Sequence, residues 1–359
     1  MDRLRIATWN VNSVRARVDR VVDWMQRAEI DVLAMQETKC AGDQFPAMTF
    51  LGAGYEVVHH GHDQWNGVAI ASRVGFDDVV CGFDGQPAWG GKDEARAIGA
   101  TCGGVRVWSL YVPNGRTVAD PHYRYKLDWL AALKDTAEGW LADNPQAQIA
   151  LMGDWNIAPR DEDVWDVAVF RGSTHITEPE RTAFAAIEHS YADVVRPYTP
   201  GPGTYTYWDY TQLRFPRREG MRIDFILASP SLAQRVIHAE IARDERKTGK
   251  NRIGSPSDHA PVFVDLRSPA DPNEHLADVG SGEQPVESID AGLETFEDGL
   301  AVNQPAVGSP PAQVGERLVE SIPHLQRVEA LHRRSLGEQI DVVRRSGMLT
   351  REVARDHTA

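Results

Sequence analysis

The chain has 359 residues, 42% of them hydrophobic, which is enough for one large globular domain with a buried core. Its formal net charge of −14 on its own argues against a nucleic-acid partner, because phosphate neutralisation requires clustered lysines and arginines. The amino terminus is charged from its second residue, and no run of eighteen apolar residues occurs, so we expect a cytoplasmic protein without a membrane span.

Short apolar runs rich in valine, isoleucine and alanine recur through residues 1–267, and they predict β-strands. In chain order these runs are RIATWNV (5–11), DVLAMQE (31–37), YEVVHH (55–60), GVAIAS (67–72), RVWSLYV (106–112), QIALMGDWN (148–156), RIDFILAS (222–229) and APVFVDL (260–266).

Two amphipathic helices are predicted between these strands. One apolar face is formed by Val14, Val18, Val21, Met25 and Ala28, and the other by Leu127, Leu130, Leu133, Ala137 and Leu141. Because some connections contain helices and others are short loops, we expect mixed sheets. The prediction is an α/β fold, a four-layer sandwich of two mixed β-sheets packed face to face with helices outside.

The segments after residue 267 differ in composition from the rest. Residues 268–312 contain nine acidic residues, six prolines and no lysine or arginine, which predicts an acidic disordered linker. Residues 313–359 carry eight arginines and alternate apolar and charged positions at helical spacing, which predicts an amphipathic helical tail interrupted at Pro323. Its partner is not indicated by the sequence. More than half of the net negative charge lies in these two segments, so the overall charge does not describe the domain at 1–267.

The three cysteines, Cys40, Cys81 and Cys102, show neither CxxC spacing nor a neighbouring histidine pair. This spacing favours neither a zinc site nor a disulfide framework. We expect three buried thiols in a reducing compartment.

Polar residues stand at the ends of five predicted strands. They are Asn10 with Asn12, Glu37, Asp154 with Asn156, Asp224, and Asp258 with His259. Each of them taken singly would be read as a solvated turn residue. An antiparallel component in the sheets would bring all five strand ends to one edge. The set is rich in oxygen and free of thiols, which favours Mg²⁺ or Mn²⁺ over zinc.

Seven blocks carry a family resemblance, and all fall in the expected order. They are WNVNSVRAR (9–17), MQETK (35–39), LYVPNG (110–115), GDWNI (153–157), TYWDY (206–210), RIDFIL (222–227) and SDHAPV (257–262). Over residues 3–266 the chain resembles exonuclease III and its abasic-endonuclease relatives in the endonuclease/exonuclease/phosphatase superfamily. The resemblance implies a DNase-like sandwich and a monomeric DNA-repair hydrolase. Such an enzyme would cleave 5′ to abasic sites and would trim the 3′ ends of duplex DNA as exonuclease and phosphatase. In a bacterium it would lie with the nucleoid.

The resemblance also implies roles for individual residues. Glu37 would be the principal ligand of Mg²⁺, for which Mn²⁺ substitutes, at an edge lined by Asn10, Asn12, Asp154, Asn156, Asp258 and His259. Asp154 would orient or deprotonate the attacking water, and Asn156 would hold that water. Asp224 would keep the His259 imidazole charged against the phosphate. The same phosphate would be bound by Tyr111, Asn114 and Arg116.

Substrate contacts are expected in the segment that follows residue 200. The resemblance implies that Tyr207, Trp208 and Ile223 form a slot for a flipped sugar without its base, although an aromatic run is more often part of a core. The bacterial family pattern has Trp at the position of Tyr207. Two basic runs flank this segment, and we expect them to contact DNA phosphates rather than form a solvated face. They are Arg214, Arg217, Arg218 and Arg222, and Arg243, Arg246, Lys247, Lys250 and Arg252.

Other functions remain open on the same scaffold, because fold alone does not determine function. A lipid phosphodiesterase would carry an exposed aromatic hairpin or a secretion signal, and the chain lacks the signal. A regulatory protein built on a degenerate nuclease would lack catalytic residues, whereas every expected position is filled.

Overall fold

The computed structural model describes residues 3–249 and 253–268, and in them two six-stranded mixed sheets. The first sheet has the strand order β11-β12-β1-β2-β4-β3 and the second β5-β6-β7-β8-β10-β9. The strands of the first sheet are β1 (Arg3–Asn10), β2 (Val32–Gln36), β3 (Glu56–His60), β4 (Val68–Ser72), β11 (Val236–Ile241) and β12 (Val262–Arg267). Those of the second are β5 (Asp77–Cys81), β6 (Ala97–Cys102), β7 (Val105–Tyr111), β8 (Ile149–Asp154), β9 (Ala192–Asp193) and β10 (Asp224–Ala228).

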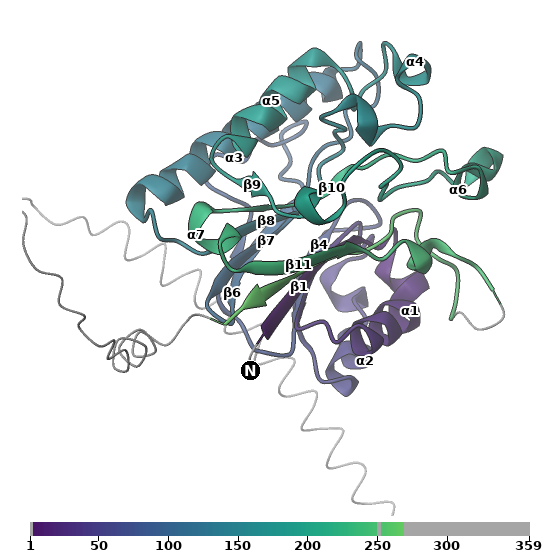
Figure 1. Ribbon diagram of the computed structural model, residues 1–359. Helices are drawn as coiled ribbons and strands as arrows, with labels where there is room; N and C mark the ends of the chain where they lie inside the picture. Colours follow the sequence, from purple (N-terminus) through teal and green to yellow (C-terminus); the bar gives the residue numbers. More distant parts are fainter. Residues whose placement is uncertain (1–2, 250–252, 269–359) are drawn as a thin grey trace, which may run out of the picture. The chain divides into compact units, whose positions relative to one another are not determined.

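Helices cover the outer faces of both sheets, as Figure 1 shows. Their bounds are α1 (Val14–Arg27), α2 (Ala47–Gly52), α3 (Pro121–Asp143), α4 (Val167–Phe170), α5 (Glu178–Glu188), α6 (Arg214–Arg217) and α7 (Pro230–Ala233). Residues of α1 and α2 pack with the outward residues of the first sheet in one apolar cluster. Residues of α3 and α5 do the same on the second sheet. The predicted four-layer α/β sandwich is confirmed.

Alternate residues of the central strands face the core between the two sheets. Ile6, Ala34 and Ile70 of the first sheet lie in one buried cluster with Val107 and Met152 of the second. Neighbouring strand residues point the other way, toward the helices. The central strands are therefore apolar on both faces, and this is why they were readable as continuous apolar runs.

Antiparallel pairing places the five polar strand ends together. β10 runs antiparallel to β8, so that Asp224 pairs with Asp154, and β12 runs antiparallel to β1. A residue at the start of β10 therefore meets one at the end of β8, and Asp258 and His259, which precede β12, come to the end of β1. The expected common edge is confirmed.

Strands β7 and β8 approach each other closely at Gly153. A Cβ built at this glycine would lie 1.8 Å from the carbonyl oxygen of Leu110. The parallel pairing of β7 with β8 matches Leu110 with Gly153 and Tyr111 with Asp154. Only glycine permits this approach, and the approach places Tyr111 next to Asp154.

Some expectations about elements were wrong. Cys81 is exposed, because β5 is an edge strand, whereas Cys40 and Cys102 are buried. On α3, Leu130, Leu133 and Ala137 lie in the cluster against the second sheet and the half-buried Leu141 packs on it, as expected, whereas Leu127 is half-buried outside that cluster and Tyr125 and Trp129 join it.

Two further points concern the extent of the chain. In the part that the structure describes, no helix combines the length and the apolar character needed to cross a membrane. The predicted tail at 313–359 and all but the first residue of the predicted linker at 268–312 lie outside the described residues. The domain limits at 267 and 312 stay predictions.

Candidate active site

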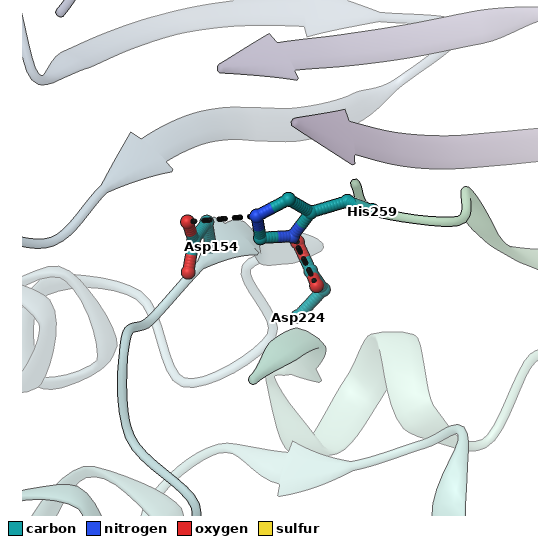
Figure 2. A group of neighbouring side chains, drawn as sticks. All are labelled: Asp154, Asp224 and His259. Carbon is teal, nitrogen blue, oxygen red and sulfur yellow. Dashed lines mark hydrogen bonds and ion pairs between the residues drawn. The ribbon is translucent and has the colours of Figure 1, made fainter. Parts of the chain in front are cut away.

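A histidine ring lies between two buried carboxylates at the common edge of the sheets, as Figure 2 shows. The Nδ1 atom of His259 lies 2.9 and 3.1 Å from the two carboxylate oxygens of Asp224. Its Nε2 lies 3.8 Å from Oδ2 of Asp154. The three residues are 1 to 4% exposed, so solvent screens their charges little.

This arrangement keeps the proton on the imidazole. Burial acts to lower the pKa of His259, but the carboxylates of Asp224 and Asp154 outweigh it and raise that pKa to about 10. Burial raises the pKa of Asp154 to about 7, the His259 charge opposes the rise, and the Asp224 charge adds to it. Asp154 is thereby suited to accept a proton near neutral pH.

Glu37 lies on the other side of Asp154 and is held by a set of hydrogen bonds. Nδ2 of Asn10 donates to Glu37 at 3.0 Å and to Asp154 at 2.9 Å. The hydroxyl of Tyr111 donates to Glu37 at 2.8 Å. Burial raises the pKa of Tyr111 well above its usual value and the Glu37 charge adds to the rise, so the phenol keeps its proton.

The oxygens around Glu37 already converge on a cation. The ammonium of Lys39 lies 2.6 Å from Oε2 of Glu37 and 2.5 Å from Oδ1 of Asn12. Nδ2 of Asn12 donates to Asp258 at 3.0 Å. This all-oxygen edge fits a hard divalent ion. Asp154, Asp224 and His259 also offer ligand atoms within 4.8 Å of one another. We favour the Glu37 edge, because a protonated imidazole has no lone pair for a metal.

Three residues of this edge hold left-handed backbone conformations, with φ of 42° at Asn12, 53° at Glu37 and 51° at Asn156. Residues other than glycine adopt this region rarely, and such positions concentrate at functional sites. The strain at these positions supports a functional role for the edge.

Asn156 connects the edge to residues that the sequence analysis missed. Nδ2 of Asn114 donates to Oδ1 of Asn156 at 3.1 Å, and His175 Nε2 lies 3.2 Å from the same oxygen. The ammonium of Lys126 donates to the Asn156 carbonyl at 2.7 Å and pairs with Glu180 at 2.5 Å, fully buried. Neither His175 nor the buried pair belongs to a recognised block, so no sequence signal pointed to them.

The expected slot is only partly as predicted. Tyr207 and Ile223 share a small apolar cluster with Met221, and the Tyr207 ring lies 4.9 Å from that of His259. Trp208, by contrast, is completely buried in a different cluster with Tyr205 and Ala260. Placing Trp208 in the slot was wrong, because consecutive residues of an extended segment face opposite sides. Met221, which pairs with Tyr207, lies in the cluster where Trp208 was expected.

The basic residues also divide into two groups. Arg217 and Arg218 are exposed, Arg214 is half-buried, and the Arg116 side chain is 56% exposed. Arg222 is 1% exposed and donates twice to Asp193, at 2.7 and 3.0 Å. Its predicted contact with DNA is wrong, because the guanidinium is already satisfied inside the domain. Lys250 and Arg252 lie outside the described residues.

Comparison with protein families shows which family the chain belongs to. The model of the Endonuclease/Exonuclease/phosphatase family matches residues 7–259, which include both the Glu37 edge and the His259 pair. The chain belongs to this family.

Members of the endonuclease/exonuclease/phosphatase family resemble the chain over its described domain. Exodeoxyribonuclease III of Haemophilus influenzae is 28% identical over 280 residues, covering 74% of this chain and all of the relative. The structure of an AP endonuclease from Archaeoglobus fulgidus is 37% identical, with a TM-score of 0.66 and coverages of 73% and 98%. A 3′-5′ exonuclease from Neisseria meningitidis is 34% identical, with a TM-score of 0.68 and coverages of 74% and 100%.

These relatives confirm the predicted family and the DNase-like fold. They also confirm that the chain is a hydrolytic nuclease of the DNA-repair type. A second Neisseria structure is described as a 3′ phosphatase bound to a product DNA hairpin, and it is 34% identical with a TM-score of 0.68.

Proposed function

We propose that this enzyme hydrolyses phosphate esters in duplex DNA, 5′ to abasic sites and at 3′ ends. The observation that carries the proposal is the His259 imidazolium held between Asp224 and Asp154, next to the Glu37 edge. Water attack on a phosphodiester requires a cation, a carboxylate that accepts a proton near pH 7, and oxygen ligands for a metal ion. His259, Asp154 and the Glu37 edge supply these groups.

Asp154 is proposed as the base that takes the proton of the attacking water. Asn156, whose backbone NH donates to Asp154 at 2.9 Å, keeps that carboxylate in place. The His259 imidazolium faces the phosphate and stabilises the negative charge that develops on its oxygens. The Asn114 amide has a second N–H that would donate to a phosphate oxygen, and the Tyr111 hydroxyl would donate to another once a metal ion on Glu37 releases it.

Glu37 and Asn12 would hold the divalent ion in place of the Lys39 ammonium, with Asp258 nearby. Mg²⁺ suits this oxygen set, and Mn²⁺ would replace it. A bound ion supplies charge neutralisation at the phosphate and at the leaving oxygen. His259 serves as a cation in this arrangement and not as a ligand.

The substrate assignment rests on the relatives and on the slot. Relatives named AP endonuclease, 3′-5′ exonuclease and 3′ phosphatase are 34 to 37% identical to the chain. The half-buried Tyr207 ring next to His259, packed on the buried Met221 and Ile223, offers an apolar contact for a sugar without its base. The proposed enzyme is a monomer that acts in the cytoplasm on double-stranded DNA with abasic sites or 3′ ends.

One assay tests the proposal. The purified protein is incubated with Mg²⁺ and three labelled duplexes, which carry an abasic analogue, a 3′ phosphate or an intact recessed 3′ end. We expect hydrolysis that EDTA stops, and Asp154→Asn should lower it on the order of 10²- to 10⁴-fold while DNA binding persists. No hydrolysis of any duplex, or full activity in the Asp154→Asn variant, would contradict the proposal.

A further inference from the structure

A basic cavity of about 430 Å³ lies beside the active site. It is bounded by the loop that carries α6, labelled in Figure 1, and by the 3-10 turn η5 (Arg243–Arg246). Its walls hold two aromatic rings and four basic side chains, which are Tyr210, Phe215, Arg214, Arg243, Arg246 and Lys247. Trp208 links the cavity wall to the active site, because its carbonyl accepts from Arg246 at 3.1 Å and its NH donates to the carbonyl of Asp258 at 2.9 Å.

Two of the four basic side chains form no ion pair with a described residue. Arg214 pairs with Glu219 at 2.7 Å, and Lys247 pairs with Asp244 at 2.5 Å. Within residues 3–249 and 253–268, no carboxylate lies within ion-pair distance of Arg243 or Arg246. Asp209 also lines the cavity, but its carboxylate accepts two hydrogen bonds from Thr211.

Arg246 is the more deeply buried of the two. The residue is 7% exposed, its Nη2 donates to the neutral carbonyl of Trp208 at 3.1 Å, and its Nε has no hydrogen-bond partner among the described residues. Burial lowers the pKa of both Arg246 and Arg243. A buried cation whose hydrogen bond goes to a neutral carbonyl rather than to a contacting anion is unfavourable, and an anion in the cavity would relieve this.

Aromatic rings hold both guanidinium groups in place. Arg243 lies 4.4 Å from the centroid of Phe215 and 5.6 Å from that of Trp208. Arg246 lies 4.8 Å from the centroid of Tyr210 and 5.3 Å from that of Phe215. Stacking on a ring leaves the edge of a guanidinium free to donate, and it fixes the fork before a ligand arrives.

We propose that Arg243 and Arg246 form a second phosphate-binding site, which holds a phosphate of the DNA strand outside the reaction centre. The inference rests on the proposed function, because DNA as substrate supplies the phosphate. Guanidinium forks match phosphate oxygens in charge and geometry. The second site would fix the register of the strand while the first phosphate is hydrolysed.

The test measures binding of the full-length protein to a fluorescent duplex in EDTA, at several salt concentrations. Arg243→Gln should weaken binding on the order of tenfold at about 0.1 M salt and reduce the slope of log affinity against log salt by about one. Arg235→Gln is the matched control. Arg235 is also half-buried, its pKa is likewise lowered by burial, and it donates to Arg267 at the far end of the first sheet. This control should change neither quantity.

Substrate length locates the phosphate. Duplexes are shortened by one nucleotide at a time from each side of the reacting group. Wild type should lose affinity on the order of tenfold at one step, and Arg243→Gln should show no loss at that step. Inorganic phosphate should compete with the duplex in wild type and less in the variant. Arg246→Lys keeps the positive charge but lacks the paired N–H donors of a guanidinium. This variant should also show no loss of affinity at that step and weaker competition by phosphate, at an unchanged melting temperature.

An identical salt slope and an identical length dependence in wild type and Arg243→Gln would overturn the second site. Because binding is measured without metal, this result does not depend on hydrolysis. A protein that shows the predicted binding but cleaves none of the three duplexes would instead overturn the proposed function.

Discussion

The Asp224→Asn substitution tests the central pair of the site. The change keeps the shape of the side chain but removes the charge that lies 2.9 Å from Nδ1 of His259. Among the groups that raise the pKa of His259 from 6.5 to about 10, the Asp224 charge is the largest. The whole rise represents on the order of 5 kcal/mol of preference for the imidazolium, and Asp154 and Asp258 supply part of it. Loss of the Asp224 contribution lowers this preference, so we expect a larger neutral fraction of His259 at pH 8.

The expected result is a fall of kcat at pH 8 on the order of 10²- to 10⁴-fold. The alkaline limb of the pH profile should also move to lower pH, because the imidazole now loses its proton earlier. Single-turnover hydrolysis of the abasic duplex from pH 6 to 9.5 measures both. Adding the substitution to His259→Asn should have little further effect, since the two residues act as a pair. An unchanged alkaline limb in Asp224→Asn would refute this reasoning.

Three further variants address the metal edge, the core and the acid limit. Glu37→Gln should raise the Mg²⁺ concentration for half-maximal rate, with partial recovery at high Mn²⁺, and an unshifted titration would remove Glu37 from the metal site. Trp208→Ala should lower the free energy of unfolding by about 3–5 kcal/mol and depress all three activities together, and selective loss of abasic incision would return Trp208 to the slot. Burial lowers the pKa of His122 to about 4, so the unfolded chain binds a proton first and stability falls as pH drops from 6.5 toward 4. Urea unfolding at pH 7 and 4.5 measures the fall in the free energy of unfolding between the two pH values. This fall should be about 1–2 kcal/mol smaller in His122→Gln than in wild type. An equal fall in both proteins would show that His122 is not the group concerned.

The apolar runs predicted the central strands because both of their faces are buried. The eight predicted strands are present, each within a few residues of its expected limits. β6 (AIGATC) and β11 (VIHAEI) were missed because small or alternating residues do not form a continuous apolar run. β5 was missed because an edge strand needs little apolar character, and its sequence DDVVC is mostly exposed.

The sequence predicted the site residues that fall in the seven family blocks. It did not predict the roles of residues whose function depends on which side chain they contact in the folded domain. Asp154, Asp224 and His259 meet as expected because antiparallel pairing joins their strand ends. Arg222 reads as a DNA contact in sequence but pairs with Asp193, twenty-nine residues away. Trp208 reads as a wall of the slot but lies on the opposite side of its segment. Sequence patterns give residue type and spacing, whereas these two errors concern which surface a side chain meets.

The active site is divided between the two sheets. Asn10 belongs to β1 in the first sheet and Asp154 to β8 in the second, and the hydrogen bond between them is the point where metal edge and proposed base meet. His259, which precedes a strand of the first sheet, is bonded to Asp224 in the second. Neither sheet alone carries a complete set of reacting groups. The catalytic rate therefore reports whether the two sheets have packed together. A folding intermediate or a proteolytic fragment with only one formed sheet would have native secondary structure in that sheet but no nuclease activity.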